Sequence, residues 1–308
     1  MSASDITAGA METAEFTAAP DLTAKRSWRS VKSAIMTGLM IASVIAVAVP
    51  LVAVVWAVFA RGLQVVVHGF PAFFVDEIPV IARKPGPGMG PAIIGTLLAT
   101  GVATLLAVPL GVAGAVYLNE YGLKNRFSRL VRFMSNVMTG VPSIVMGLFV
   151  YVTWTLRFGY SAFGGALALA CLMLPVVIGA TEQMLKLVPN HLREASYAVG
   201  TSKSRTIMAV VLPAALPGIV SGSLLAVARA AGETAPLLFA TGAATEYNLN
   251  PFVEANTALS LQIFGNATSS FVAAQDRAWG AALTLVLLTF VITLVARFVT
   301  ARFARIRR

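Results

Sequence analysis

The sequence is poor in charge, in cysteine and in histidine. Only 12% of its 308 residues are Asp, Glu, Lys or Arg, about half the share found in an ordinary globular domain, whereas 57% are hydrophobic. The single cysteine, Cys171, excludes a disulfide framework or a cysteine-based metal site within the chain, and its apolar surroundings indicate a small core residue. The two histidines, His68 and His191, stand in different loops. We therefore expect no metal site and no catalytic residue.

Long uncharged runs dominate what is present, and they predict an all-α, polytopic membrane protein with about six transmembrane helices. A helix needs roughly 20 apolar residues to cross a bilayer, and six runs meet or approach that length. The first is longer than the apolar core of a cleavable signal, so it is interpreted as a span. The six runs are 35–60, 91–118, 134–156, 163–185, 214–240 and 279–296.

Basic residues mark one side of the predicted bundle. Four precede the first run, four lie in 124–132, four lie in 186–205 and five follow from Arg297 onward. By the positive-inside rule, both termini and the 186–205 loop are expected to be cytoplasmic. The net charge of +10 is then an orientation signal with weak attraction to anionic lipid. No basic or aromatic face accompanies these charges, so nucleic acid is not expected as a partner.

This topology divides the chain into three parts. The polar stretch 1–33 is predicted to be a cytoplasmic, disordered tail, 34–300 a transmembrane domain, and 301–308 a basic cytoplasmic tail. Among the opposite loops, 61–90 is interpreted as a stiff connector because it ends in proline and glycine. The nearly 40-residue loop 241–278 is long enough for an outer gate or a docking surface, and the sequence does not choose between them.

A polar stretch at about 190–213 interrupts the apolar pattern between the fourth and fifth runs. Within it, Glu194 and Ala195 are followed by Gly200 and then by Leu212 and Pro213. The pattern predicts two short helices, with a bend at Gly200, where glycine permits backbone angles closed to other residues. The second short helix is expected to end at Pro213.

This spacing resembles the EAA loop of ABC-transporter permeases, whose pattern is E-A-A, three residues, G, nine residues and I-x-L-P. Ser196 stands for the third Ala and Val210 for the Ile, both small changes. The resemblance implies a type I ABC permease of MetI-like fold, with this loop docked in a groove of a partner ATPase. The residues assigned to that coupling are Glu194, Ala195, Ala198, Gly200, Leu212 and Pro213.

The energy source must then lie outside this chain. No G-x-x-x-x-G-K-[ST] pattern, the phosphate-cradling loop of many nucleotide-binding proteins, occurs in the 308 residues. The G-P-G-M-G stretch at 86–90 lacks the lysine and is predicted to lie on the outer side. We therefore expect no cofactor in this chain, with ATP and Mg bound by the partner ATPase.

Two charges stand inside the fifth apolar run, where each costs about 2.5 to 3.5 kcal/mol on translocon-based scales. Arg229 and Glu233 are four residues apart and are predicted to meet on one face of one helix. Intramembrane charges usually face a cavity and mark a pathway, and the planar guanidinium fork matches an oxyanion. A structural salt bridge or a contact with another subunit is the alternative.

Two strings carry a second resemblance. R-A-A-G-E-T-A-P-L-L-F at 229–239 and G-V-P-S-I-V-M-G-L-F at 140–149 resemble motifs of the phosphate-transport permease A family, and with the EAA loop the resemblance covers about 35–300. It implies a multi-pass protein of the bacterial inner membrane that pairs with a sister permease. Two copies of a cytoplasmic ABC ATPase and an extracytoplasmic phosphate-binding protein would complete the transporter.

Carried onto this chain, the resemblance implies that Arg229 attracts the anion. Glu233 would accept a proton from hydrogenphosphate or hold Arg229 when the site is empty. Sulfate carries no proton near neutral pH, so a carboxylate would disfavour it. A permease for sulfate or molybdate, a secondary transporter and a membrane-embedded sensor are the alternatives.

Two backbone features of the runs complete the predictions. Pro142 lacks an N–H and is expected to break or bend the third run. Gly218 and Gly222 form a G-x-x-x-G pattern in the fifth run, which favours close helix packing. One possible partner for this packing is the sister subunit.

Overall fold

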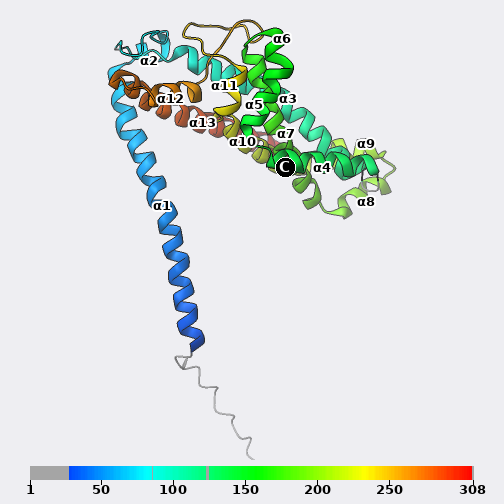
Figure 1. Ribbon diagram of the computed structural model, residues 1–308. Coiled ribbons are helices and arrows are strands. Elements are labelled where there is room, and N and C mark those ends of the chain that lie inside the picture. The colour runs from blue at the N-terminus through cyan, green and yellow to red at the C-terminus, as the bar shows by residue number, and fades with distance from the viewer. Residues whose placement is uncertain (1–27, 85, 123–124, 307–308) are drawn as a thin grey trace, which may run out of the picture. The chain divides into compact units, whose positions relative to one another are not determined.

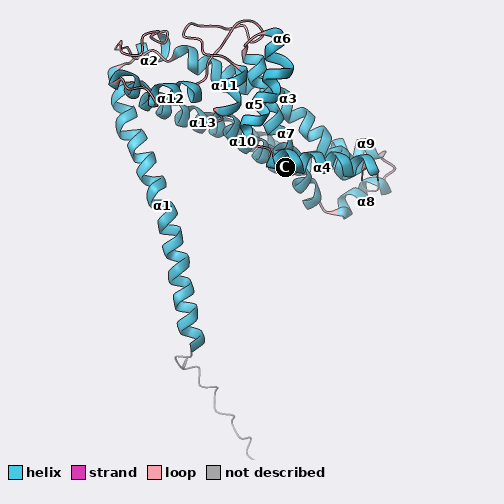
Figure 2. Ribbon diagram, viewed as in Figure 1, coloured by secondary structure: helices cyan, strands magenta, loops and turns pink. Residues whose placement is uncertain are grey.

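The computed structural model describes residues 28–84, 86–122 and 125–306, and the side chains up to residue 298. Helices make up most of these residues, and none of them forms a strand (Figure 2). The tail expected at 1–33 lies outside the described residues up to 27, and residues 28–33 belong to the first helix. Of the tail expected at 301–308, residues 307 and 308 lie outside the described part, and the rest continues the last helix.

Thirteen α-helices and three π-helical turns follow one another in the described residues. The α-helices are α1 (Trp28–His68), α2 (Ala72–Val75), α3 (Gly90–Val116), α4 (Arg126–Gly140), α5 (Ser143–Val150), α6 (Leu156–Phe158), α7 (Ala162–Leu187), α8 (Asn190–Ala198), α9 (Lys203–Thr206), α10 (Leu212–Ala231), α11 (Ala235–Ala240), α12 (Leu259–Ala267) and α13 (Val272–Ile306). The π turns are η1 (Tyr117–Tyr121), η2 (Tyr151–Thr155) and η3 (Ile207–Val211).

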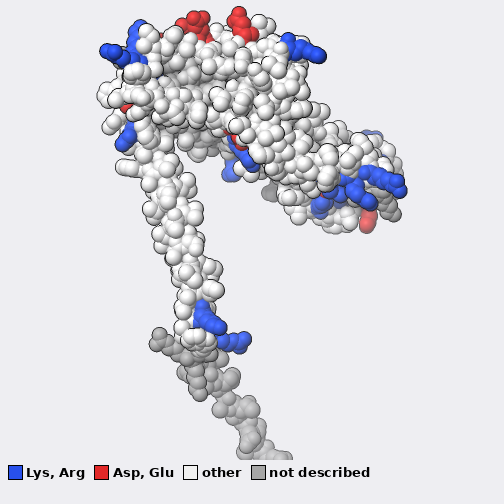
Figure 3. Space-filling view, viewed as in Figure 1, with Lys and Arg blue, Asp and Glu red and all other residues white. Residues whose placement is uncertain are grey.

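The chain falls into two units that divide within α1, after Val54. In the first unit, the most apolar stretch of α1 has no buried residues. In the second unit, α8 and α9 lie at one end, and α2, α6 and α12 lie at the other (Figure 1). We call these the α8–α9 end and the α12 end. Lys and Arg side chains gather at the α8–α9 end (Figure 3).

Five helices of the described chain are long and apolar enough to cross a membrane, or six spans if one bent pair counts as a span. The bent pair is α4 with the segment from Ser143 to Phe158, which meet at 108°. α4 ends at Gly140, and α5 begins directly after Pro142, which the sequence predicted to break this run. The third run is therefore two helices at a sharp angle, and the break predicted at Pro142 is confirmed.

The fifth run is also broken, which the sequence did not predict. α10 ends at Ala231, and α11 begins at Ala235. Gly232 is a poor helix former, and the ring of Pro236 would clash with the carbonyl four residues before it if the helix continued. Glu233 thus lies in the turn between two helices instead of on the helix that carries Arg229.

The expected stop at Pro213 is absent. Helical structure runs without interruption from Lys203 to Ala231. The π turn η3 ends at Val211, and Pro213 follows as the second residue of α10. Proline lacks the N–H that a helix interior uses, and local π geometry is one way in which a membrane helix accommodates it. The helix that leaves the polar loop is therefore continuous with the fifth span.

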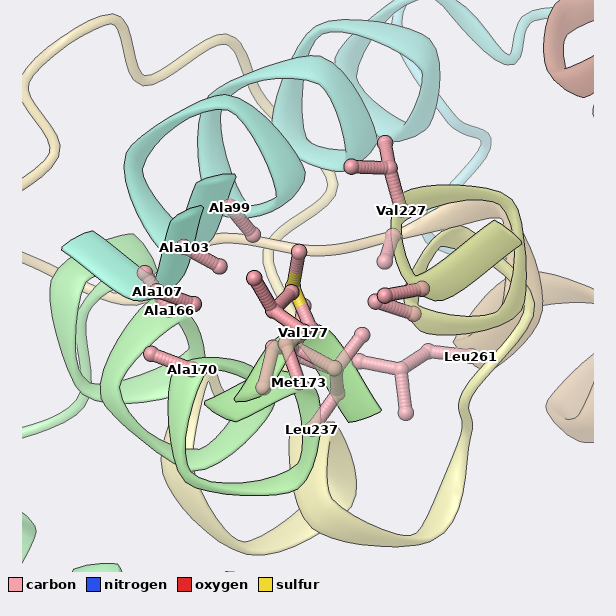
Figure 4. Close-up of a cluster of buried hydrophobic side chains, with 14 residues drawn as sticks. Ala99, Ala103, Ala107, Ala166, Ala170, Met173, Val177, Val227, Leu237 and Leu261 are labelled. Atoms are coloured by element: carbon pink, nitrogen blue, oxygen red, sulfur yellow. The ribbon is translucent and has the colours of Figure 1, made fainter. Parts of the chain in front are cut away.

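One core cluster of the second unit is rich in alanine and lies where α3, α7 and α10 meet (Figure 4). Alanines let the helices approach closely, and α11 and α12 close the cluster with Leu237 and Leu261. The G-x-x-x-G glycines face α7 of this same chain, since added Cβ atoms at Gly218 and Gly222 would meet Met184 and Ala180. The motif therefore packs against α7 of this chain, and not against a sister subunit, which was one possibility from the sequence.

Gly222→Val is expected to lower the stability of the chain by about 1–3 kcal/mol, because the larger side chain must displace α7. A Cβ at Gly222 would lie 2.5 Å from the Cβ of Ala180. Gly101→Val is the matched control, because a Cβ at that position in α3 has no neighbour within 4 Å. Thermal melting of the detergent-solubilised chain measures the difference. Equal melting temperatures for the two variants would contradict this packing.

The loops of the α12 end are ordered and bonded to one another. Residues 241–278, interpreted from sequence as a loop, contain the nine-residue helix α12. Arg277 is 2% exposed and donates to the Lys84 carbonyl at 2.9 Å, which ties the start of α13 to the 61–90 connector. Tyr247, in the loop before α12, also bonds to the 61–90 connector, because its hydroxyl donates to the Val75 carbonyl at 2.7 Å.

The Tyr247 phenol stays a donor throughout the neutral pH range. Burial and the carboxylates of Asp76 and Glu77 raise its pKa above the ordinary tyrosine value. The hydrogen bond between the two loops is therefore insensitive to pH near neutrality.

Candidate functional site

Arg229 and Glu233 meet at the break between α10 and α11. The Arg229 Nε and the Glu233 Oε1 are 3.5 Å apart, longer than the 2.7–2.9 Å typical of a strong charge-assisted hydrogen bond. The Arg229 side chain is 73% exposed, and that of Glu233 is 19% exposed. Ser260 of α12 donates to the Glu233 carbonyl at 2.9 Å and fixes the turn. The backbone at Glu233 is thus held in place, and the exposed guanidinium is only loosely paired with the carboxylate.

The core determines which way Arg229 points. Ala226 and Ala230 of the same helix belong to the buried cluster. Arg229, three residues after Ala226, lies at the edge of that buried face, and 73% of its side chain is exposed. The cavity beside the ion pair measures only about 10 Å³, which is room for no more than one water molecule. This chain therefore presents a guanidinium on its surface and encloses no anion-sized site around it.

The α8–α9 end presents the second group of predicted residues. Glu194, Ala195 and Ala198 are exposed on α8, where the short side chains of the two alanines leave the helix backbone accessible. Gly200 follows with a φ of +82°, a left-handed conformation that glycine adopts without strain. The bend predicted at Gly200 is confirmed.

Three hydroxyls fix the angle of this bend. Ser196 Oγ lies 2.6 Å from Thr201 Oγ1 and 2.9 Å from Thr206 Oγ1, and Thr201 Oγ1 also donates to the Ser196 carbonyl at 2.6 Å. Ser196 and Thr206 are buried. The serine that replaces the third Ala of the EAA pattern therefore joins α8 to α9 and the bend between them.

A buried acid anchors the same loop to the end of α3. Glu120 of η1 is 8% exposed, and its Oε1 accepts from Arg193 of α8 at 3.0 Å. Its carbonyl accepts from the Nζ of Lys203 in α9, which also lies over the ring of Tyr121 at 4.7 Å. Asn119 donates to the same carboxylate at 2.8 Å. One residue thus contacts both helices of the loop.

A second buried acid stands on α7. Glu182 is 8% exposed and pairs with Arg132 of α4 at 2.7 Å and with Lys186 at 2.8 Å. These two acids belong to no metal centre, since no cluster of three or more His, Cys, Asp or Glu occurs in the part of the chain that the structure describes.

Known proteins resemble this chain in sequence over nearly its whole length. Residues 107–308 match the family described as binding-protein-dependent transport system inner membrane component. The chain is 45% identical over 284 residues to the phosphate transport system permease protein PstA 1 of Mycobacterium tuberculosis (strain ATCC 25618 / H37Rv), covering 90% of this chain and 91% of that one. It is 37% identical over 279 residues to the PstA protein of Yersinia pestis, covering 90% and 93%. The chain belongs to the PstA family of these permeases.

Solved structures agree with this assignment at the level of the fold. An inward-facing form of the MetNI methionine ABC transporter superposes with a TM-score of 0.51 at 19% identity, covering 70% of this permease and 92% of that chain. A bacterial ABC transporter involved in the import of the acidic polysaccharide alginate gives 0.52 at 17% identity, covering 90% and 99%. The predicted all-α, MetI-like permease fold is confirmed.

The family also gives the permease its place in the cell. It is an inner-membrane component of a binding-protein-dependent ABC transport system, and its apolar helices cross the membrane. In such a system the binding protein and the ATPase are separate components, as expected from the missing nucleotide-binding motif.

The structure divides the residues that the sequence assigned to coupling into two groups. Glu194, Ala195, Ala198 and Gly200 share the exposed α8–α9 loop. Leu212 and Pro213 stand apart from that face and line an apolar groove of about 470 Å³ beside α3.

The anchoring residues of the permease were missed from sequence. Glu120 is 73 positions from Arg193 and 83 from Lys203, so no local spacing connects them. The available signal was that Glu120 is an acid directly after an apolar run, next to the basic segment 124–132.

Proposed function

We propose that this permease carries inorganic phosphate into the cytoplasm, driven by ATP hydrolysis in a separate ATPase subunit. The observation that carries the proposal is Arg229, an exposed guanidinium at a helix break, loosely paired with the carboxylate of Glu233, whose backbone Ser260 holds in place. The relatives at 45% and 37% identity are named as phosphate transport permeases. An oxyanion that accepts two parallel hydrogen bonds matches the guanidinium fork.

The chemistry of the pair suits hydrogenphosphate. At rest Glu233 holds Arg229 through a contact of 3.5 Å, which an incoming oxyanion displaces at little cost. The anion then bonds to the guanidinium while its P–OH donates a hydrogen bond to the Glu233 carboxylate, and the proton stays on the phosphate oxygen. When phosphate leaves, the ion pair closes again and restores the empty site.

The partners that we propose follow from the exposure of Arg229 and the small size of the cavity beside it. A guanidinium 73% exposed beside a cavity of about 10 Å³ requires another surface to desolvate the anion, and we assign that surface to a sister permease in a heterodimer. Two ATPase copies dock on the exposed α8 of the two permeases. An extracytoplasmic phosphate-binding protein delivers phosphate to the α12 end. The α8–α9 end and both termini are cytoplasmic, in agreement with the distribution of basic residues.

Competition between anions tests this function. The complete transporter is reconstituted with its binding protein in vesicles loaded with ATP, and uptake of labelled phosphate is measured with and without excess sulfate or molybdate. Phosphate uptake should continue in the presence of either competitor. If labelled sulfate or molybdate is imported at the rate of phosphate or faster, the permease serves another oxyanion.

Glu233→Gln is expected to raise sulfate uptake relative to phosphate uptake by about tenfold, the equivalent of ~1.4 kcal/mol. The carboxylate repels an anion that has no proton to donate, and glutamine of the same size removes that repulsion. The ratio of the two initial uptake rates, with binding protein saturated by each anion, measures the effect. An unchanged ratio would place the discrimination in the binding protein.

A further inference from the structure

Glu120 stands where the α8–α9 loop meets the end of a long span. It belongs to η1, the π turn that continues α3 without a break. Its side chain is 7% exposed, and that of Arg193, its partner, is 14% exposed. A buried ion pair is costly to desolvate unless further hydrogen bonds complete it. The donor amide of Asn119, 2.8 Å from the same carboxylate oxygen, supplies one.

Arg193 connects three segments at once. Besides Glu120, it donates to the Leu185 carbonyl at 3.0 Å and to the Val188 carbonyl at 2.7 Å, where α7 ends. It also lies 3.2 Å from Asn190 Oδ1 in its own helix. The guanidinium therefore joins α8 to the ends of α3 and α7.

Lys203 makes the equivalent connection from the other helix of the loop. Its ammonium donates to the Glu120 carbonyl and lies 4.7 Å from the centre of the Tyr121 ring. Both helices of the loop therefore bond to Glu120. α8 binds its carboxylate through Arg193, and α9 binds its backbone carbonyl through Lys203. The hydroxyls of Ser196, Thr201 and Thr206 prevent the two helices from moving independently.

We propose that Glu120 is a positioning residue that ties the α8–α9 loop to α3, so that force applied to the loop moves the span. α3 packs along α7 and shares with it the alanine-rich core to which Ala226 and Ala230 belong, on either side of Arg229. A displacement of the loop therefore reaches the helix that presents the guanidinium. This inference rests on the proposed docking of an ATPase on α8.

The experiment measures phosphate imported per ATP hydrolysed by the complete transporter in proteoliposomes with its binding protein. Glu120→Gln keeps the size of the side chain and removes its charge, which weakens the link to Arg193. We expect the ratio to fall about tenfold, within the range of typical coupling between sites, while the ATPase still co-purifies and still hydrolyses ATP. A merely structural role would lower both activities together and leave the ratio unchanged.

Glu182→Gln is the matched control. Glu182 is as buried as Glu120, at 8%, and it also pairs with basic side chains, but its partners Arg132 and Lys186 lie on α4 and α7. Its loss should leave the phosphate-to-ATP ratio at the wild-type value. An equal fall in this variant would show that any missing buried ion pair uncouples transport, which would overturn the role assigned to Glu120.

Lys203→Met decides the matter if Glu120→Gln does not assemble. Lys203 is exposed, so its substitution leaves the fold intact while breaking the contact with the Glu120 carbonyl. The ratio should fall in Lys203→Met. Where Glu120→Gln does assemble, the Glu120→Gln/Lys203→Met double variant should lose less than the two single effects combined, because both substitutions weaken the same connection between Glu120 and the loop. An unchanged ratio in Lys203→Met overturns the proposal. Failure of the ATPase to co-purify with the wild-type permease would instead refute the proposed function.

Discussion

Arg229→Ala is expected to reduce phosphate uptake by the assembled transporter at least about thirtyfold, the equivalent of ~2 kcal/mol, the lower range for truncating one partner of a desolvated charge pair. In the assembled transporter the anion would meet this guanidinium between two permeases, shielded from water. Without it, the Glu233 carboxylate remains in place and repels the anion. Initial rates of labelled phosphate uptake in proteoliposomes measure the loss.

Two further variants separate the pathway role from a structural one. Arg229→Lys keeps the charge and loses the planar fork, so uptake should lie between those of the wild type and Arg229→Ala. Arg157→Ala removes another exposed arginine, at the end of the spans where α6 lies, and should transport phosphate at the wild-type rate. Intact uptake by Arg229→Ala in a complex that retains its ATPase would remove Arg229 from the anion's path.

Gly200→Glu is expected to reduce co-purification of the ATPase by about five- to thirtyfold. Its φ of +82° costs about 1–2 kcal/mol for a residue with a side chain, and this strain would change the angle between α8 and α9. No atom lies within 4 Å of a Cβ at this position, so the substitution changes the loop without disturbing the rest of the fold. The amount of ATPase bound per permease after affinity purification measures the effect.

Gly200→Asn is the matched control for the loop. Asparagine tolerates the left-handed conformation far better than glutamate does, so the bend should survive and the ATPase should bind nearly as well as to the wild type. Normal ATPase binding by Gly200→Glu would contradict the assignment of this loop to docking. Equal losses in both variants would indicate that the side chain itself, and not the backbone angle, blocks the contact.

The long helices were predictable because membrane spans depend on a local property. A run of apolar residues long enough for the bilayer identifies a span wherever it occurs, and Pro142 and Gly200 fixed two breaks through their own backbone chemistry. The break at Gly232 was missed because the run 214–240 stays apolar on both sides of it. Hydropathy measures side chains and is insensitive to a backbone that turns.

The two groups of functional residues differ in what the sequence could predict. Arg229 was identifiable because an arginine within an apolar run is costly. Its exposure and the loose contact with Glu233 follow from tertiary packing that places Ala226 and Ala230 inward. Glu120 was not identifiable, since its partners lie 73 and 83 positions away and only the folded chain brings them together.

The continuity of α9 with α10 also required the structure. Pro213 was expected to end a helix, but a π turn before it leaves the helix intact. A continuous helix therefore connects the α8–α9 loop to the span that carries Arg229. This arrangement gives the loop two connections to the core, one through α10 and one through Glu120.

Reconstitution with and without the ATPase tests the central claim, that this permease depends on a separate ATPase for energy. Vesicles that contain both permeases and the ATPase, with phosphate-binding protein outside and ATP inside, should accumulate labelled phosphate above its external concentration. Vesicles that contain this polypeptide alone should accumulate none. Uphill accumulation by this chain alone would contradict the account and identify the protein as a secondary transporter.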